Sequence, residues 1–142
     1  MNDDPELTMS NTAAIQRLLT DMAKESPRCV LLCIYREGKE TPSSYITTGI
    51  LSDPVPFSSF ICKILSAAEE VISARLGKAE QIKHLMVETE RFTMISRRLW
   101  KSYYVLLVLR SPVECLGMPI ELLDRWEGTL RENLANIAGG LD

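Results

Sequence analysis

The side chains best suited to bind a metal or act as nucleophiles are four cysteines and one histidine in a chain of 142 residues. Cys29 and Cys33 lie in an apolar run, Cys62 lies in a helical pattern, and Cys115 stands apart. There is no CxxC pair, and His84 has no second histidine near it, so the spacing does not predict a zinc site. Buried, reduced thiols account for all four cysteines, and reduced thiols are typical of a cytoplasmic protein.

Catalytic motifs are also missing from the sequence. It contains no glycine-rich phosphate loop, no GxSxG elbow and no HExxH motif. The neighbouring carboxylates Glu69–Glu70 and Glu88/Glu90 fall in helical or turn patterns, where exposure to solvent explains them. His84 has no sequence cue for catalysis and is interpreted as a structural or surface residue. We therefore expect a protein that is not an enzyme and that has no metal, cofactor or catalytic residue.

The stretch from Arg97 to Tyr104 mixes basic and aromatic residues at an expected hairpin. Such a mixture can bind phosphates and bases through charge and stacking. The chain as a whole has a net charge of −3 and a pI of about 5.3, which argues against nucleic acid, so a solvated hairpin tip is the simpler interpretation. If Trp100 is exposed, then Arg97, Arg98 and Trp100 are candidate contacts for a protein partner.

The composition is that of one globular domain spanning 1–142. Apolar residues make up 46% of the chain and charged residues 25%. No apolar run approaches the roughly 20 residues that a membrane span needs. Residues 1–9 are polar and acidic, which indicates a disordered tail rather than a signal peptide. We expect a soluble, cytoplasmic protein without a membrane span.

The strongest secondary-structure pattern runs from Asp53 to Gly77. Its apolar residues repeat one stripe of an α-helix, which predicts that the stripe lies on a core. Asp53 stands at the expected N-cap, and Gly77 follows the last stripe residue. At ~1.5 Å per residue this helix is roughly 35 Å long. The stripe consists of Phe57, Phe60, Ile61, Ile64, Leu65, Ala68, Val71, Ile72 and Leu76.

The remaining elements are two more helices and five strands. One helix is predicted from Ser10 or Asn11 to Ser26, because the residue before Pro27 avoids helical geometry. The other starts near Met118 and ends at Gly139–Gly140. Alternating or continuous apolar runs predict strands at 29–35, 43–51, 82–88, 92–99 and 103–109, with Trp100 in a turn.

The element order is α-β-β-α-β-β-β-α, which predicts an α/β (α+β) fold. We expect a single five-stranded antiparallel sheet with one helix on one face and two helices on the other. The last three strands form a meander, and the first strand pairs with the fifth, giving the sheet order 2-1-5-4-3. This order places the two fully apolar strands in the middle, where both faces are covered.

This element order resembles the roadblock/dynein-light-chain family, which is related to longin and profilin-like folds. The resemblance covers residues from Asn11 to Ile137, and its most specific piece is Leu116-Gly117-Met118 leading into the last helix. The polar segment Pro42-Ser43-Ser44 departs from the glycine-bearing turn that the family often has between its first two strands.

The resemblance implies a non-enzymatic interaction protein. Roadblock-like proteins form homo- or heterodimers and act as platforms or regulators for small Ras-like GTPases, or as adaptors in motor and signalling complexes. Their third strands can pair across the dimer, with the central helices side by side. The expected partners are therefore a second copy or another roadblock protein, and a small GTPase. The alternative is a small-molecule-sensing αβα domain, for which an apolar cavity beneath the 53–77 helix would be evidence.

Two surfaces are the candidates for self-association. On the 53–77 helix, small residues would let a second helix approach closely; the alternative is a polar face that is exposed to solvent and has no partner. The 82–88 strand is an edge that pairing across a two-fold axis would protect; the bland alternative is an edge shielded by lysine and a loop. The predicted interface residues are Ser59, Cys62, Ser66 and Ser73 on the helix, and Ile82, His84 and Met86 on the strand.

Overall fold

The computed structural model describes residues 9–39, 41–48, 51–78, 80–111, 113 and 115–136. The predicted α-β-β-α-β-β-β-α order is confirmed. In chain order the elements are α1 (Met9–Ala23), β1 (Cys29–Arg36), β2 (Ser44–Thr47), α2 (Val55–Leu76), β3 (His84–Glu88), β4 (Phe92–Trp100), β5 (Tyr103–Arg110) and α3 (Gly117–Leu134).

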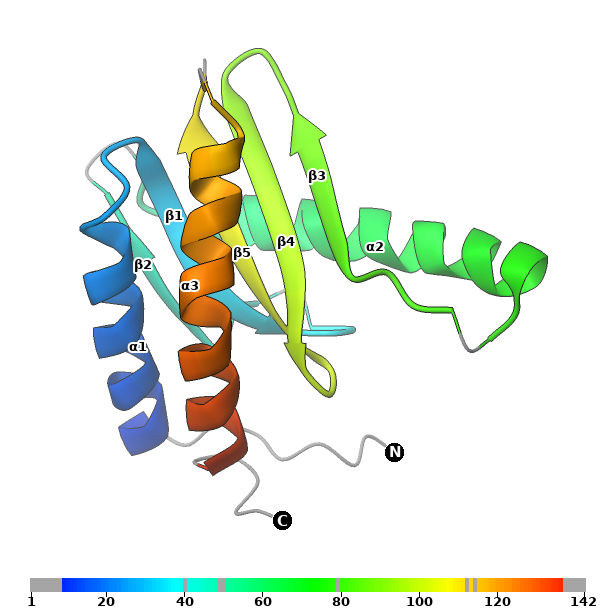
Figure 1. Ribbon diagram of the computed structural model, residues 1–142, viewed down its shortest axis with the longest axis horizontal. Helices are drawn as coiled ribbons and strands as arrows, with labels where there is room; N and C mark the ends of the chain where they lie inside the picture. The colour runs from blue at the N-terminus through cyan, green and yellow to red at the C-terminus, as the bar shows by residue number, and fades with distance from the viewer. Residues whose placement is uncertain are drawn as a thin grey trace.

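The five strands form one antiparallel sheet in the predicted order β2-β1-β5-β4-β3 (Figure 1). The two fully apolar strands, β1 and β5, are central neighbours, with Ile34 opposite Val105. Every residue of β1 is buried, and β5 is buried from Tyr103 to Leu109. Both strands are covered on two faces, which explains why their sequences show a continuous apolar run instead of alternation.

The helices lie on the two faces of the sheet as predicted, with α1 and α3 on one face and α2 on the other (Figure 1). The core beneath α1 and α3 includes Ile15, Leu19, Leu122 and Leu130. The core beneath α2 includes Ile61 and Leu65 with the inner residues of β1, β4 and β5. Each central strand therefore contributes alternate residues to a different core, as the period of two requires.

The ends of α2 differ slightly from the expectation. Pro54, not Asp53, occupies the N-cap position, and Asp53 Oδ1 instead accepts a hydrogen bond from the Val55 N–H at 3.1 Å. Gly77 follows the helix with φ +105°, a backbone conformation that a residue with a side chain rarely adopts. The chain then returns to the sheet edge to begin β3.

Three other boundaries needed correction. β3 begins at His84, so Ile82 precedes the strand instead of lying within it. Trp100 is the last residue of β4, and the turn begins at Lys101, which has φ +49°. The expected tail at 1–9 overlaps the start of α1 at Met9, and the rest of that tail lies outside the described residues. Ile137 and Gly139–Gly140, where the last helix was expected to end, also lie outside them.

The prediction that the whole apolar stripe of α2 lies on a core is wrong. Phe60 is 42% exposed, Val71 61% and Leu76 69%, whereas Ile61 and Leu65 are buried. There are two physical reasons. Phe60 and Val71 lie on a flank of α2 that points away from the sheet, as described below. Leu76 is at the end of the helix, and α2 crosses the sheet and continues past β3, so its last turns have no sheet of this chain beneath them (Figure 1). Apolar residues exposed on such an overhang mark a surface that a partner can bury.

Candidate protein–protein interface

Strand β3 forms one edge of the sheet, next to the overhanging part of α2 (Figure 1). Its register with β4 places His84 opposite Arg97 and Glu88 opposite Thr93. The same register continues at both ends, because the Arg98 N–H donates to the Lys83 carbonyl at 3.1 Å and the Thr89 N–H donates to the Phe92 carbonyl at 2.7 Å. These two bonds show which backbone groups of β3 face β4.

In an antiparallel ladder, alternate residues of a strand bond to the same neighbour. Since Lys83 and Thr89 bond to the β4 side, the odd-numbered residues between them do so as well. The N–H and C=O groups of His84, Met86 and Glu88 therefore point away from β4. A row of outward-facing backbone groups is a template for pairing with another strand.

The predicted interface residues on the sheet edge do not share one face. Met86 packs with the core on the α1–α3 side, whereas Ile82 packs with the core on the α2 side, together with Leu85 and Val87. His84 is exposed. Ile82 was expected in the same strand as His84 and Met86, but it precedes β3, so the strand's period of two does not apply to it.

The predicted interface residues on α2 also separate into two groups. Ser59, Ser66 and Ser73 are seven residues apart, which places them on one flank of the helix. Ser66 is exposed, and Ser59 and Ser73 are half-buried. Cys62 instead faces the core of its own chain, where it is 7% exposed and its thiol donates to the Lys39 carbonyl at 3.3 Å.

A second exposed flank of α2 carries large apolar side chains that the sequence interpretation had assigned to the core. Phe60 and Val71 are eleven residues apart, about three turns, so they lie on the same side of the helix. Their direction differs by about 100° from that of Ile61, which is buried. The signal was present in the sequence, because the apolar stripe is wider than the face that a single sheet can cover.

The three predicted partner contacts at the hairpin do not form one site. Arg97 is 4% exposed, and its Nη1 lies 2.6 Å from Asp124 Oδ1 and 3.1 Å from Glu127 Oε1 of α3. Arg98 lies on the opposite face, where its guanidinium carbon is 5.7 Å from the centre of the Tyr104 ring. Consecutive strand residues point to opposite faces, which explains the separation. Arg97 thus links β4 to α3 through two ion pairs.

Arg98 and Trp100 do meet at a small cleft beside β3. Residues 81–83 and the end of β4 line this cleft of about 230 Å³, and α3 borders it. We call it the fork. Its charged lining residues are Lys83, Arg98, Lys101 and Arg131, with Glu127 as the one carboxylate. Trp100 is half-buried, and Lys101 Nζ lies 4.8 Å from the centre of its ring.

A polar cluster lies between α2 and the sheet. Burial, and then a hydrogen bond and charge from Glu37, raise the pKa of Glu69 above its usual value, while Arg98 acts in the opposite direction. Burial, followed by the charge of Glu69, also raises the pKa of Tyr104, whose hydroxyl has no hydrogen-bond partner among the described residues. Nearby, the hydroxyls of Tyr35 and Ser96 are hydrogen-bonded to each other.

The cysteines fall into two classes. Cys29, Cys33 and Cys62 are buried, whereas Cys115 is exposed, which corrects the expectation that all four are buried. Burial raises the pKa of Cys29 to about 11 and that of Cys33 further still. Within the part of the chain that the structure describes, no group of three or more histidine, cysteine or acidic side chains is placed to hold a metal ion.

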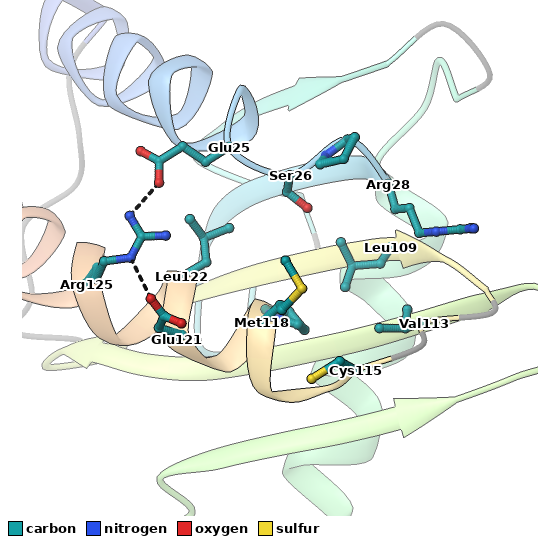
Figure 2. A pocket seen from close by; sticks show the side chains of 12 residues that line it. Glu25, Ser26, Arg28, Leu109, Val113, Cys115, Met118, Glu121, Leu122 and Arg125 are labelled. Atoms are coloured by element: carbon teal, nitrogen blue, oxygen red, sulfur yellow. Dashed lines mark hydrogen bonds and ion pairs between the residues drawn. The ribbon is translucent and has the colours of Figure 1, made fainter.

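A larger cavity lies on the opposite side of the sheet from α2. It has a volume of about 440 Å³ and lies between the end of α1 and the start of α3 (Figure 2). Leu109, Val113 and Met118 supply apolar walls, and Arg125 at one end pairs with Glu25 at 2.6 Å and Glu121 at 3.4 Å.

None of the helices in the described part of the chain combines the length and the apolar character that a membrane span requires.

The sheet order and the placement of the helices define the roadblock fold, so the predicted resemblance is confirmed at the level of fold. The roadblock/LC7 domain from Streptomyces avermitilis matches with a TM-score of 0.61 and 11% identity, over 84% of this chain and 96% of that chain. Among roadblock structures, the chain is similar to MglB. Myxococcus xanthus MglB matches with a TM-score of 0.77 and 9% identity, over 96% of this chain and 98% of that chain.

The gliding protein MglB from Thermus thermophilus is also similar, with a TM-score of 0.70 and 17% identity, over 97% of this chain and 98% of that chain. No protein-family model and no curated protein matches the sequence. At these identities the three-dimensional structure carries the relationship, and it is a relationship of fold.

Proposed function

We propose that this chain is a non-enzymatic dimeric scaffold protein that binds and regulates a small Ras-like GTPase. The single observation that supports this proposal best is the overhang of α2 beside the open edge of β3 (Figure 1). A second copy related by a two-fold axis can complete both features at once, since its strand pairs with β3 and its sheet extends beneath the overhang.

The overhang favours such a pairing for an energetic reason. Leu76 lies on the sheet-facing side of α2, as Leu65 does, but is 69% exposed. Burying a large aliphatic side chain is worth about 1.5–3 kcal/mol. Pairing of the two β3 edges would also remove an exposed edge that invites aggregation. The flank with Ser59, Ser66 and Ser73 would lie toward the second α2 helix, because small side chains permit close approach.

The GTPase is assigned to the other flank of α2. Phe60 and Val71 are exposed there, and a dimer that uses the serine flank leaves them at the surface. Large apolar side chains grouped on an otherwise polar helix are typical anchors for a protein partner. The Ras-like class of partner comes from the roadblock resemblance, and the structural similarity to MglB is consistent with it.

The oligomeric state is the first test. Light scattering on the purified chain at tens of micromolar is expected to give twice the mass of one copy. A single-copy mass at that concentration would overturn the dimer. A complementary measurement is sedimentation across a dilution series, which yields the dissociation constant needed for the comparisons of variants below.

The second test concerns the GTPase. A purified Ras-like GTPase from the same organism, loaded with GDP or with a non-hydrolysable GTP analogue, is titrated with this chain. A platform can shift a GTPase only by binding one nucleotide state more tightly, so the two affinities are expected to differ by at least tenfold. Hydrolysis and nucleotide exchange measured with and without the chain separate a passive scaffold from an activator. Equal affinity for both states would overturn the regulatory role.

The alternative function, sensing of a small molecule, has one observation in its favour. The cavity between α1 and α3 has about 440 Å³, within the range of ligand pockets, although it lies on the face opposite α2 (Figure 2). A ligand screen by thermal shift tests the sensor function. Leu122→Trp, which fills the cavity, is the control and should abolish the thermal shift of any ligand that binds there. A ligand bound there that leaves GTPase binding unchanged would favour the sensor.

A further inference from the structure

We propose that the fork beside β3 receives the β3–β4 turn of a second copy, and that this contact sets the register of the dimer with Met86 on the two-fold axis. The inference rests on the dimer of the proposed function and adds to it a specific alignment and a specific ionic contact. The occupant of the fork is thus a defined segment of the same protein, residues Glu88–Glu90 of the second copy.

The backbone of β3 favours one register over the others. Only His84, Met86 and Glu88 present outward N–H and C=O groups within the strand. Two copies related by a two-fold axis can bond through these groups in several registers, each displaced by two residues. One register, with Met86 opposite Met86, pairs all three residues of each strand. It forms about six interstrand hydrogen bonds, and any displacement loses some of them.

This register also fixes which residues of the two copies are neighbours across the edge. His84 stands opposite Glu88 of the second copy, Lys83 opposite Thr89, and Ile82 opposite Glu90. The acidic turn of the second copy therefore arrives at the fork. Glu88 and Glu90 are both exposed, and neither side chain has an ion pair or hydrogen bond among the described residues. By symmetry the same contact forms twice in the dimer.

The fork is suited to receive these carboxylates. Its lining has four basic residues and one acidic residue, in a chain whose net charge is −3. Glu127 is already engaged by Arg97 and Arg131 of its own chain, and Lys83 has no ion pair among the described residues. The cations that remain available, Lys83 and Lys101 above all, favour an anionic group beside the exposed edge.

The hydrophobic contacts of this register agree with the ionic ones. Leu85 stands opposite Val87 of the second copy on the α2 side of the joined sheet. Both side chains are half-buried in the single chain and lie next to the α2 layer. The α2 overhang, with Leu76 on its sheet-facing side, continues in the same direction past the edge (Figure 1). The same alignment thus allows the interstrand hydrogen bonds, the ionic contact at the fork and the burial of the α2 overhang.

The charge contact is tested by exchanging its two signs. Lys83→Glu and Glu90→Lys are made singly and together in the full chain, and the dimer dissociation constant of each is measured by sedimentation. Because each substitution acts at two symmetric sites, each single variant is expected to weaken the dimer about tenfold or more. The double variant, and an equimolar mixture of the two single variants, are expected to return to within about threefold of the original.

Matched controls use an exposed pair at the end of α1, a helix that packs near β2 at the opposite edge of the sheet. Asp21 is in α1 and Lys24 follows its last residue; Lys24 Nζ lies 3.9 Å from Asp21 Oδ1, and both side chains are exposed. Lys24→Glu and Asp21→Lys make the same changes of net charge and are expected to leave the dissociation constant unchanged within about twofold. Far-UV circular dichroism and thermal unfolding confirm that all variants are folded.

The register is tested by disulfide trapping in a Cys115→Ser background, which removes the exposed thiol. Met86→Cys is expected to form a covalent dimer under mild oxidation, since directly opposite Cα atoms in a bonded pair lie about 5.5 Å apart. His84→Cys alone is expected to form none, because its own copy lies about 13 Å away along the strand. A mixture of His84→Cys and Glu88→Cys is expected to cross-link.

The outcomes separate this inference from the proposed function. If the original chain is monomeric, both fail together. If it is a dimer but the single charge reversals behave like the α1 controls, or the double variant does not recover, the fork contact is wrong and the dimer stands. Cross-linking through His84→Cys alone would overturn the register in the same way.

Discussion

Leu65 and Leu76 lie on the same side of α2, about three turns apart, yet Leu65 is 3% exposed and Leu76 is 69% exposed. The helix is continuous between them, and both side chains point toward the plane of the sheet. The difference is that α2 continues past the edge strand β3, so that its end, where Leu76 is the last residue, has no sheet of this chain beneath it (Figure 1). This relationship makes the end of α2 a surface that a second copy is expected to complete.

Replacing Leu76 with serine is therefore expected to weaken the dimer without destabilising the single chain. Loss of a side chain buried only in the dimer should raise the dissociation constant about tenfold or more, counted at two symmetric sites. Leu65→Ala is the contrasting variant, expected to lower the free energy of unfolding by about 2–4 kcal/mol. Sedimentation and urea unfolding measure the two effects. A Leu76→Ser variant that dimerises normally would remove the overhang from the interface.

Ser66→Glu tests the serine flank of α2. Ser66 is exposed, so a glutamate is accommodated in the single chain. In the dimer, two carboxylates would face each other across close-packed helices, and we expect the mass by light scattering to fall to that of one copy. Thr129→Glu, at an exposed position of α3, is the control and should leave the mass unchanged. An unchanged dimer in Ser66→Glu would exclude this flank.

Arg97→Met is expected to destabilise the fold, because it leaves Glu127, whose side chain is 20% exposed, without its buried cation. Asp124 is 63% exposed and loses little, so the expected decrease in the free energy of unfolding is about 2 kcal/mol. Arg125→Met removes a cation whose own side chain is 52% exposed, and it should lower the free energy of unfolding less than Arg97→Met does. Equal effects in urea unfolding would mean that Arg97 does not tie α3 to β4.

The raised pKa of Glu69 predicts a dependence of stability on pH. Burial and Glu37 disfavour the charged form, so the folded chain binds this proton more tightly than the unfolded chain does. The contribution to stability is complete below the unfolded pKa and is lost as pH rises through the folded pKa. Glu69→Gln is expected to flatten this decline. Chemical unfolding at a series of pH values measures it, and identical pH profiles would contradict the prediction.

The four cysteines are expected to differ in their reactivity. Burial raises the pKa of Cys29 and Cys33, and Cys62 is also buried, so none of these presents an accessible thiolate near neutral pH. Cys115 is exposed. A chromogenic thiol reagent should titrate one cysteine rapidly in the folded protein, none in Cys115→Ser, and all four after unfolding. Rapid reaction in folded Cys115→Ser would show that one of the buried positions opens.

The fold could be predicted from the sequence to a large extent, because its signals are local. Continuous apolar runs predicted β1 and β5 as central strands, and the alternation and turns placed the meander of β3, β4 and β5. Once two central strands and a meander are given, few sheet orders remain possible. The sheet order and the division of the helices between the two faces were both predicted in this way.

The candidate interface was predicted less well. Periodicity identified the apolar residues of α2 but assigned Phe60, Val71 and Leu76 to the core, and it placed Cys62 at the interface when its own core buries it. Arg97 and Arg98 are neighbours in the sequence, but the pleat of β4 directs their side chains to opposite faces. Arg97 therefore forms an ion pair with α3, whereas Arg98 lines the fork.

The sequence by itself determined the order of the elements, the central strands and the amphipathic character of each helix, because these depend on residues close together along the chain. Only the tertiary structure decided where the sheet ends relative to α2, which backbone groups of β3 face outward, and which charges meet at the fork. Those features depend on the lengths and register of elements far apart in the sequence, and periodicity within one element carries no information about them.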